Sequence, residues 1–484
     1  MNAALRKVSL AAFLLLLALL VNINVLQAVQ PRSLATKPGN TRAIIASYNV
    51  QRGYIVVGNT VIATSEPTND QLRYLRTYPG GPMYAAVTGY ATQFTRTGIE
   101  AAENGILSGQ DDRLFVHRLT NILNGTQQQG GIVRLTINAK VQKAAWDAMQ
   151  GKVGAAVAID PSTGAILAMV STPSYDPSTL ALHDTAAVDA TMKKLAADPN
   201  QPLLNRALAQ TYPPGSTFKV ITSAAALSSG MTPDTLIDAP HRLPLPLTTL
   251  ELHNFNDEFC TPSANGKQTL LQALSISCNT AFAKLGLQLG DAALRKQAEA
   301  FGFDDNSLDV PIPVAASVFP AVLNQPQTAQ SAIGQFDVRM TPLEAAMIAA
   351  AVANHGKLER PYLVGSIDSP NLQTISTTQP TDYNKQVVTP QVADELTQMM
   401  LAVVQNGTGT SAQIPGVSVA GKTGTAQNAP GHAPHAWFIG FVPGATPHIA
   451  VAVIVEAGDA GGNDVTGARV AAPVAKAMIQ AALP

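Results

Sequence analysis

The longest apolar run of the chain lies close to its N-terminus. Residues 8–21 are almost wholly apolar, and a thinner apolar pattern follows them. About twenty helical residues cross a hydrocarbon core that is about 30 Å thick. Arg6 and Lys7 precede the run and no acidic residue does, which favours an N-terminus in the cytoplasm. The pattern therefore predicts a cytoplasmic head over residues 1–7 and a transmembrane signal anchor over residues 8–29.

A cleaved signal peptide is the alternative to an anchor. Its apolar core is about 7–15 residues long and is followed by an Ala-x-Ala cleavage site. Residues 25–29 read Val-Leu-Gln-Ala-Val and do not supply that site cleanly, so the anchor is favoured. In either case the rest of the chain is exported. We expect a single-pass protein of the plasma membrane with its bulk on the extracytoplasmic side, and not a polytopic transporter, because no other apolar run approaches this length.

Residues 30–150 mix short β-branched runs with Gly and Asn turn signals. These runs predict strands over residues 42–45, 54–57 and 61–63. A helical pattern follows over residues 111–123. Residues 135–138 are expected to form a strand, and Asn138 is expected to cap a helix over residues 139–149. The segment is therefore predicted to be a small, strand-rich domain.

Residues 151–484 carry a different pattern. Apolar runs around a Pro-Ser-Thr-Gly turn predict a β-hairpin with strands over residues 155–160 and 165–170. Ala- and Leu-rich stretches predict helices over residues 217–227, 269–276, 343–353 and 470–482, and a strand is expected over residues 448–456. Proline-containing stretches around residues 238–250, 305–330 and 367–390 are interpreted as loops. This order of elements predicts an α+β fold, in which an antiparallel sheet carries packed helices.

Charge is scarce in the chain and unevenly distributed. Charged residues make up 13% of the 484 residues, about half of the usual share. The formal net charge of −1 argues against a basic nucleic-acid binder. Residues 31–150 hold twelve Lys or Arg and seven Asp or Glu, whereas residues 151–484 hold seventeen and twenty-five. The basic part follows the predicted anchor, where it either favours anionic lipid head groups or is ordinary solvated surface.

Cys260 and Cys278 are the only cysteines of the chain. Two cysteines exclude a disulfide-rich scaffold and a four-cysteine zinc site, and we expect no metal and no cofactor. In an exported domain these residues, eighteen positions apart, form a disulfide or remain as two buried free thiols. The disulfide is favoured and is worth roughly 3 kcal/mol of stability.

The first candidate for chemistry is the Ser-Thr-Phe-Lys motif of residues 216–219. Two prolines and a glycine end the loop before it, and an Ala-rich helical pattern follows. Ser216 and Lys219 are then three positions apart on one face of the first helical turn. A neutral lysine can take the serine proton, and backbone N–H groups at the helix start can stabilise an oxyanion. Alone the motif is weak evidence, because Ser-x-x-Lys is common by chance.

Two further motifs follow in order along the chain. Ser-Cys-Asn, at residues 277–279, lies 61 residues after Ser216, and Lys-Thr-Gly-Thr, at residues 422–425, begins 145 residues later at the start of a predicted strand. The ordered combination of Ser-x-x-Lys, Ser-x-Asn and Lys-Thr-Gly is typical of the penicilloyl-serine acyltransferases, which are the penicillin-binding proteins and serine β-lactamases. The sequence resembles this group in all three motifs.

Beyond the motifs, nearly all of residues 40–484 resembles the class B penicillin-binding proteins, and the compact N-terminal part resembles their actinobacterial members. Segments that carry this resemblance include Arg52–Ile55, Ala158–Pro161, Pro173–Pro177, Gly407–Gly409 and His435–Phe438. The resemblance implies a penicilloyl-serine transferase fold over residues 151–484. It also implies a non-catalytic stem or dimerisation-like domain over residues 30–150.

The resemblance implies a role for each catalytic residue. Ser216 would attack the penultimate D-alanine of a D-alanyl-D-alanine stem peptide, and Lys219 would be its base. Ser277 would relay a proton to the departing D-alanine, and Lys422 would help to hold the proton network. Asn279 would bind the peptide backbone of the donor.

The remaining residues implied for the site bind the substrate. Thr423, Gly424 and Thr425 would line the donor peptide, with the two threonine hydroxyl groups on its terminal carboxylate. Backbone N–H groups of Ser216 and Thr425 would form the oxyanion hole.

The resemblance also implies a function and partners. The chain would be a membrane-anchored peptidoglycan D,D-transpeptidase that transfers the acyl group to an acceptor amine during wall synthesis and division, and β-lactams would inhibit it. A multi-span glycan polymerase and other division or elongation proteins are the expected partners, because residues 31–150 leave no room for a glycosyltransferase domain. The alternatives are a D,D-carboxypeptidase or β-lactamase-like hydrolase, and a non-catalytic β-lactam-binding scaffold.

Overall fold

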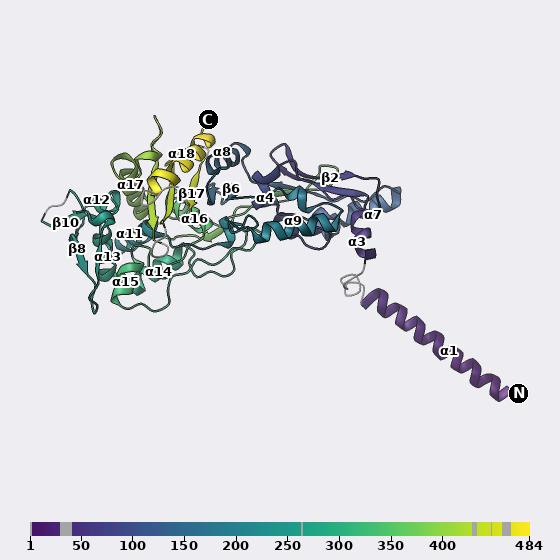
Figure 1. Ribbon diagram of the computed structural model, residues 1–484. Coiled ribbons are helices and arrows are strands. Elements are labelled where there is room, and N and C mark those ends of the chain that lie inside the picture. Colours follow the sequence, from purple (N-terminus) through teal and green to yellow (C-terminus); the bar gives the residue numbers. More distant parts are fainter. Residues whose placement is uncertain (1, 30–40, 263–264, 428–432, 447, 457–465) are drawn as a thin grey trace.

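The computed structural model describes residues 2–29, 41–262, 265–427, 433–446, 448–456 and 466–484. Helix α1 (Asn2–Asn24) continues into a π-helical turn (Val25–Val29) and leads away from the body of the molecule (Figure 1). The segment Ala4–Gln27 is long and apolar enough to cross a membrane, and none of it is buried against the rest of the chain. The helix predicted for the anchor is therefore present and is a candidate membrane span.

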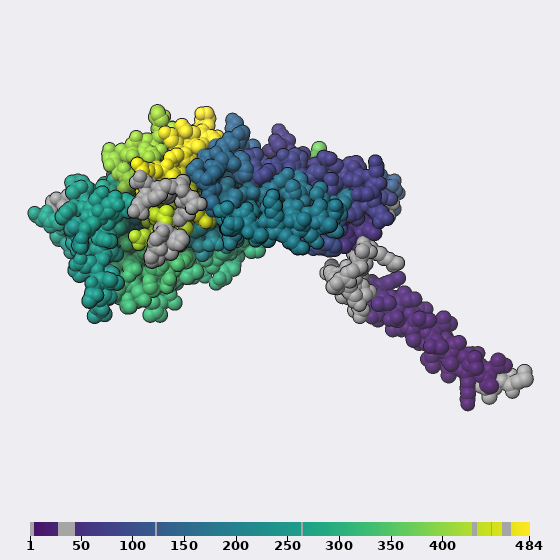
Figure 2. Space-filling model, viewed as in Figure 1, coloured from purple at the N-terminus to yellow at the C-terminus, as the bar shows by residue number. Residues whose placement is uncertain are grey.

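Two large sheets, of six and five strands, and the helices around them build most of the body. The body is elongated (Figure 2). The N-terminal sheet has six strands in the order β13-β12-β4-β1-β2-β3. These are β1 (Ile55–Val57), β2 (Thr60–Pro67), β3 (Tyr74–Thr77), β4 (Ile132–Leu135), β12 (Val364–Asp368) and β13 (Thr374–Thr377). β1 and β4 are parallel, and the other pairs are antiparallel. The helices between β3 and β4 are α4 (Ala85–Thr88), α5 (Gly98–Ala102), α6 (Asn104–Leu107) and α7 (Phe115–Asn124).

The C-terminal sheet has five strands, and all of its pairs are antiparallel. Their order is β15-β16-β17-β5-β6, with β5 (Gly154–Ile159), β6 (Ile166–Thr172), β15 (Ala420–Ala426), β16 (His435–Phe441) and β17 (Ala450–Val455). Side chains alternate between its two faces. Ala156 and Ala158 of β5 pack with the helices on one face, whereas Val157 and Ile159 join the main core on the other. The predicted hairpin and the predicted α+β fold are confirmed.

Helices cover both faces of this sheet. α8 (Ala139–Met149) and α18 (Ala472–Ala482) lie side by side on one face (Figure 1). The other helices are α9 (Thr185–Ala197), α10 (Arg206–Ala209), α11 (Lys219–Ser228), α12 (Leu270–Ser275), α13 (Asn279–Leu289), α14 (Asp291–Phe301), α15 (Gln325–Ser331), α16 (Pro342–Ala353) and α17 (Pro390–Asn406). Short strand pairs are formed by β7 (Leu236–Asp238) with β10 (Lys267–Thr269), β8 (Arg242–Pro244) with β9 (Glu251–His253), and β11 (Leu358–Glu359) with β14 (Asp382–Asn384).

The strand predicted over residues 42–45 is wrong. These residues belong to helix α3 (Thr41–Tyr48). Ile44 and Tyr48 lie four residues apart on one half-buried face of that helix, which is the helical spacing and not the alternation of a strand. A four-residue apolar run is too short for β-branched content alone to decide between the two structures.

Four further predictions need correction. The strand expected over residues 135–138 is β4, three residues earlier, and Asn138 caps α8 as predicted, its side chain accepting a hydrogen bond from the N–H of Lys140 at 3.0 Å. The stretch 367–390 contains β13, β14 and the end of β12 instead of a continuous loop. β12 pairs with β4, which is remote in sequence, so a local pattern could not reveal it. The loops expected around residues 238–250 and 305–330 likewise contain β8 and most of α15.

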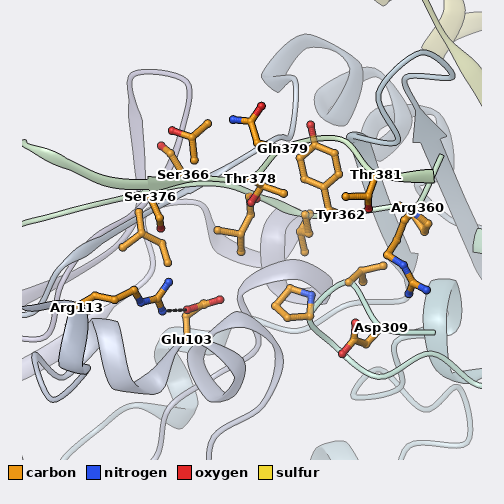
Figure 3. A pocket seen from close by; sticks show the side chains of 17 residues that line it. Glu103, Arg113, Asp309, Arg360, Tyr362, Ser366, Ser376, Thr378, Gln379 and Thr381 are labelled. Atoms are coloured by element: carbon orange, nitrogen blue, oxygen red, sulfur yellow. Dashed lines mark hydrogen bonds and ion pairs between the residues drawn. The ribbon is translucent and has the colours of Figure 1, made fainter. Parts of the chain in front are cut away.

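The two domains interlock at their junction. α8 precedes the predicted boundary at residue 151 but packs on the sheet that follows it, through Val141 and Met149. β12 lies far beyond that boundary in sequence yet completes the N-terminal sheet. A pocket of about 330 Å³ lies at the junction, between Glu103 and Arg113 on one side and the β12–β13 hairpin and Tyr362 on the other (Figure 3). The C-terminal sheet is therefore held directly against the N-terminal domain.

A buried charge cluster joins α5 to the N-terminal sheet. Glu100 is fully buried and accepts hydrogen bonds from Arg52 Nε at 2.5 Å and Arg76 Nε at 2.6 Å. The hydroxyl of Tyr78 also donates to its carboxylate, at 3.2 Å. Burial alone raises the pKa of Glu100, but the two guanidinium groups outweigh burial and lower the pKa to about 2.

Replacing Glu100 with alanine should destabilise the protein by about 3–5 kcal/mol, because two buried guanidinium groups lose their anion. Because the folded-state pKa of Glu100 is lowered, its contribution is complete above the unfolded-state pKa and is lost as the pH falls toward about 2. Denaturant unfolding at pH 7 and pH 3 should therefore show a smaller difference between wild type and variant at pH 3. Asp112→Ala, at an exposed carboxylate of the same domain, is the control and should change nothing. Equal stability of Glu100→Ala and wild type at pH 7 would contradict the account.

Candidate active site

Ser216 lies in a tight turn at the start of the central helix α11. A 3-10 turn, Gly215–Phe218, leads directly into that helix. Gly215 has φ +52°, and a Cβ there would lie 3.0 Å from the carbonyl oxygen of Thr425. A side chain at this position would therefore be strained and would push apart the serine turn and the strand beside it. Trp437 Nε1 donates a hydrogen bond to the Pro213 carbonyl at 3.0 Å and holds the loop before the turn.

Lys219 is fully buried one turn after Ser216 and is held by the second motif. Its Nζ donates to the Ser277 carbonyl at 2.8 Å and to Asn279 Oδ1 at 2.7 Å, and it lies 3.2 Å from Ser277 Oγ. Ser277 lies in the turn between α12 and α13, and Asn279 is the first residue of α13, about sixty residues along the chain. The fold therefore brings the first two predicted motifs into direct contact.

The two buried lysines of the site carry lowered pKa values. Burial, and the charge of Lys422 nearby, lower the pKa of the Lys219 amine well below its usual value. Burial lowers the pKa of Lys422 to about 7. A buried lysine near another cation loses its proton more readily than one in water, so Lys219 can be a neutral amine near neutral pH. A neutral amine has the lone pair that a general base needs.

The third motif lies in the middle of β15, which is an edge strand of the catalytic sheet. Lys422 is fully buried, Thr423 is buried and Thr425 is half-exposed. In an antiparallel strand the N–H and C=O of one residue point to the same side. Because the Thr425 carbonyl lies beside Gly215, the Thr425 N–H is also directed toward the serine turn. Among the described residues no strand pairs with the outer edge of β15, so this edge presents its backbone groups next to Ser216.

Sequence reasoning missed two residues that hold the motifs in place. Asn254, largely buried, accepts hydrogen bonds at Oδ1 from the backbone N–H groups of Asn279 (2.8 Å) and Thr280 (3.1 Å). It thereby caps α13, whose own N-cap residue makes no side-chain bond. Thr408 shares a hydrogen bond of 2.6 Å with Thr423 Oγ1. Thr408 lies in the Gly-Thr-Gly segment noted above, whereas no sequence signal pointed to Asn254.

Ser277 has an unusual backbone conformation. Its φ is +62°, in the left-handed region that residues other than glycine rarely adopt. Such a conformation costs on the order of 1–3 kcal/mol and persists where the surrounding structure enforces it. Here the enforcing contacts are the Lys219 bond to the Ser277 carbonyl and the disulfide between Cys260 and Cys278. The turn is fixed in the orientation that presents the Ser277 hydroxyl to Lys219.

Removal of the disulfide should loosen the second motif. The Cys260→Ser/Cys278→Ser variant should lose roughly 3 kcal/mol of stability. Its acylation by a fluorescent penicillin should slow about tenfold, because Ser277 and Asn279 are no longer pinned in position. Thermal unfolding and labelling kinetics, each with and without reductant, measure both effects. Wild-type labelling kinetics in a destabilised variant would show that the disulfide serves stability alone.

Comparison with known proteins identifies the family of the chain. A family model described as the penicillin-binding protein transpeptidase domain matches residues 154–480, and one described as the penicillin-binding protein A dimerisation domain matches residues 52–133. The whole chain is 46% identical to the peptidoglycan D,D-transpeptidase PbpA of Mycolicibacterium smegmatis and 44% identical to that of Mycobacterium tuberculosis, and it covers 99% of each. The ceftriaxone acyl-enzyme complex of M. tuberculosis penicillin-binding protein A superposes with a TM-score of 0.88 at 43% identity, covering 91% of this chain and 100% of the other.

The chain therefore belongs to the penicillin-binding protein transpeptidase family. Within it, the chain has the two-domain arrangement of the class B proteins of the PbpA type. The resemblance that the three motifs indicated is confirmed.

Proposed function

We propose that this chain cross-links peptidoglycan stem peptides as a serine D,D-transpeptidase, with Ser216 as the residue that is acylated. Ser216 Oγ attacks the carbonyl carbon of the penultimate D-alanine, and the bond to the terminal D-alanine nitrogen breaks. The donor peptide is then held on Ser216 as an ester. An amine of a second strand attacks that ester, forms the new amide and releases the serine. β-Lactams acylate the same oxygen, and the ester they leave is slow to react further.

The observation that carries this proposal is the state of Lys219. Its amine is buried and its pKa is lowered well below the usual value, chiefly by burial and then by Lys422. The amine lies one turn after Ser216 and is fixed by the Ser277 carbonyl and Asn279. Lys219 therefore takes the proton of the attacking Ser216 hydroxyl, a step that typically contributes about 10²–10⁴-fold in rate.

The departing D-alanine needs a proton on its nitrogen. Ser277 Oγ lies 3.2 Å from the Lys219 amine, so it can pass the proton that Lys219 has accepted to the leaving amine. Lys422, with a pKa of about 7, is part of the same proton network and keeps a positive charge below that pH. The proton taken from the acceptor amine in the second step follows the same route in reverse.

The donor peptide binds along the outer edge of β15. An extended peptide can add to an exposed strand edge through main-chain hydrogen bonds. Thr423 and Thr425 bind the terminal carboxylate of the donor peptide. Gly424 lets β15 lie close to the turn that carries Ser216. Asn279 binds the peptide from the opposite side. The N–H groups of Ser216 and Thr425 stabilise the oxyanion, and one such donor is worth about 3–4 kcal/mol.

We further propose that α1 anchors the chain in the plasma membrane with both domains on the extracytoplasmic side. Arg6 and Lys7 at the start of α1 favour this orientation, since basic flanks remain on the cytoplasmic side. Lipid-linked precursors of the wall lie at this outer face. The chain has no second catalytic domain for glycan synthesis among the segments described above, so we expect a multi-span glycan polymerase, with other division or elongation proteins, to act beside it.

Mass spectrometry of the acyl-enzyme tests the assignment of Ser216. Incubation of the full chain with a D-alanyl-D-alanine thioester analogue should add the mass of one acyl group. Trypsin cuts after Arg206 and Lys219, so the adduct should appear on the peptide of residues 207–219 and map to Ser216. An adduct on any other residue, or none at all, would refute the proposed nucleophile.

A further inference from the structure

The apolar face of helix α7 is exposed and its polar face is turned toward the domain. This is the reverse of the usual arrangement in a soluble domain. Phe115, Val116, Leu119 and Leu123 are 57%, 74%, 47% and 78% exposed. At about 100° per residue, these four side chains fall within an arc of about 100°. A surface helix normally buries such an apolar stripe against its own domain. Here the stripe, which we call the outer face of α7, points away from the protein.

The polar side of α7 faces the domain instead. Among the residues of α7 whose burial is described, His117, Arg118 and Asn121 are the partly buried ones. Arg118 Nη1 donates to the carbonyls of Asp111 at 2.8 Å and Gly109 at 3.2 Å. Polar contacts therefore hold α7 in place. The Arg118 guanidinium, which lies 6.0 Å from the centroid of the Phe115 ring, belongs to the same helix, and the outer face stays exposed.

α7 is located at the end of the molecule that is tied to the anchor. Gln127 Nε2, just after the helix, donates to the Asn49 carbonyl at 3.4 Å, and Asn49 directly follows α3. Figure 1 shows α7 beside α3 at the end of the body from which α1 leads away. Eleven residues, 30–40, separate α3 from the end of the anchor segment, and fully extended they span at most about 40 Å. α7 is thus permanently within reach of the membrane that α1 enters.

We propose that the outer face of α7 inserts into the outer leaflet of the membrane that holds the anchor, so that the body has a second attachment to lipid. An amphipathic helix of this kind lies in the interface plane with its apolar side chains about 5–10 Å deep. The side chains of α1 that meet lipid have similar exposure in the isolated chain, as Leu10 (59%) and Phe13 (61%) show. The net basic charge of residues 31–150 adds attraction to anionic head groups. The two attachments together fix the height of the body and the direction in which the edge of β15 faces the wall.

The occupant we infer is lipid and not a second copy of the chain. The anchor α1 keeps a lipid surface close to α7 at all times, whereas a second copy of the chain would have to bind from solution or from elsewhere in the membrane. This inference rests on the proposed anchoring by α1, and the experiment below reports on the anchoring separately.

Depth-dependent quenching in vesicles tests the proposal with the full chain. Both native cysteines are in a disulfide, so Val116→Cys can carry a single environment-sensitive fluorophore. Ala292→Cys, exposed on α14 at the other end of the body, carries the same fluorophore as the positional control. The vesicles contain phosphatidylethanolamine and phosphatidylglycerol, with a nitroxide on the upper acyl chain. The label at residue 116 should be quenched at least about threefold more than the label at residue 292, because the outer face lies within the interface.

Paired variants give the matched comparison. Leu119→Glu/Leu123→Glu places two charges on the outer face and should reduce the quenching at residue 116 to the level of residue 292. Thr120→Glu/Asn124→Glu adds the same charge at exposed positions beside that face and should leave the quenching unchanged. Labelling of Ser216 by a fluorescent penicillin should be equal in both variants, which shows that they are folded.

Three other outcomes of the experiment would each contradict the proposal in a different way. Flotation of the chain with the vesicles but no quenching at residue 116 overturns the lipid contact while the anchoring stands. A blue-shifted but unquenched label, whose shift depends on protein concentration, assigns the outer face to a second copy and also overturns it. If the chain does not float with the vesicles, the anchoring fails first and this inference fails with it.

Discussion

Replacing Ser216 with alanine should abolish covalent labelling by a fluorescent penicillin. The loss should be at least about 10⁴-fold in the rate of acylation, because the variant lacks the hydroxyl oxygen that is proposed to form the acyl bond. The fold should survive, since Ser216 is only half-buried and its oxygen makes none of the hydrogen bonds that hold the turn. Gel-based labelling over time, with thermal unfolding of the same samples, measures both quantities.

Ser228→Ala is the matched control for this variant. Ser228 is an exposed serine at the end of the same helix, and its replacement should leave both labelling and stability unchanged. Labelling of Ser216→Ala at a rate near that of wild type would remove Ser216 from the mechanism.

Replacing Lys219 with methionine should slow acylation by about 10²–10⁴-fold, the usual contribution of a general base. Methionine is unbranched, only one atom shorter than lysine and fills most of the buried space, but it cannot take the serine proton. Stopped-flow acylation by penicillin gives the rate. A variant that acylates as fast as wild type would show that the base is another group.

The pH profile of acylation distinguishes the chemistry of Lys219 from a packing role. Lys219 must be neutral and Lys422 protonated, so the rate should rise as the pH passes the lowered pKa of Lys219 and fall again above about pH 7. In Lys422→Arg the guanidinium stays charged, so the fall above about pH 7 should disappear. A profile that is flat between pH 5 and pH 9 in wild type would contradict the proposed roles of both lysines.

Elements that depend on local patterns were predictable from the sequence. The β5–β6 hairpin follows from two apolar runs around a Pro-Ser-Thr-Gly turn, and α8 begins where Asn138 can cap it. The helix at residues 42–45 was missed because a four-residue run carries both periodicities equally well. β12 and β13 were missed because they complete a sheet whose other strands lie more than two hundred residues earlier.

The candidate site likewise has features that could be predicted from the sequence and features that could not. The motif residues could be proposed from the sequence because acyl transfer needs a nucleophile, a base and anion-binding groups, and three short motifs contain these side chains. Their contacts could not be read from spacing, since only the folded chain brings Lys219 to the Ser277 carbonyl. The left-handed backbone of Ser277 and the cap that Asn254 provides are likewise products of tertiary packing. Neither residue type carries a local signal for such a role.

The central claim is that the acyl group on Ser216 passes to an amine and not to water. The direct measurement incubates the full chain in vesicles with polymerised, uncross-linked glycan strands that carry pentapeptide stems, and analyses the products after muramidase digestion by liquid chromatography and mass spectrometry. The account predicts dimeric stem peptides, together with release of one D-alanine per cross-link, and their loss when penicillin is added or Ser216 is replaced. Release of D-alanine with only monomeric tetrapeptides would make the chain a carboxypeptidase and contradict the account.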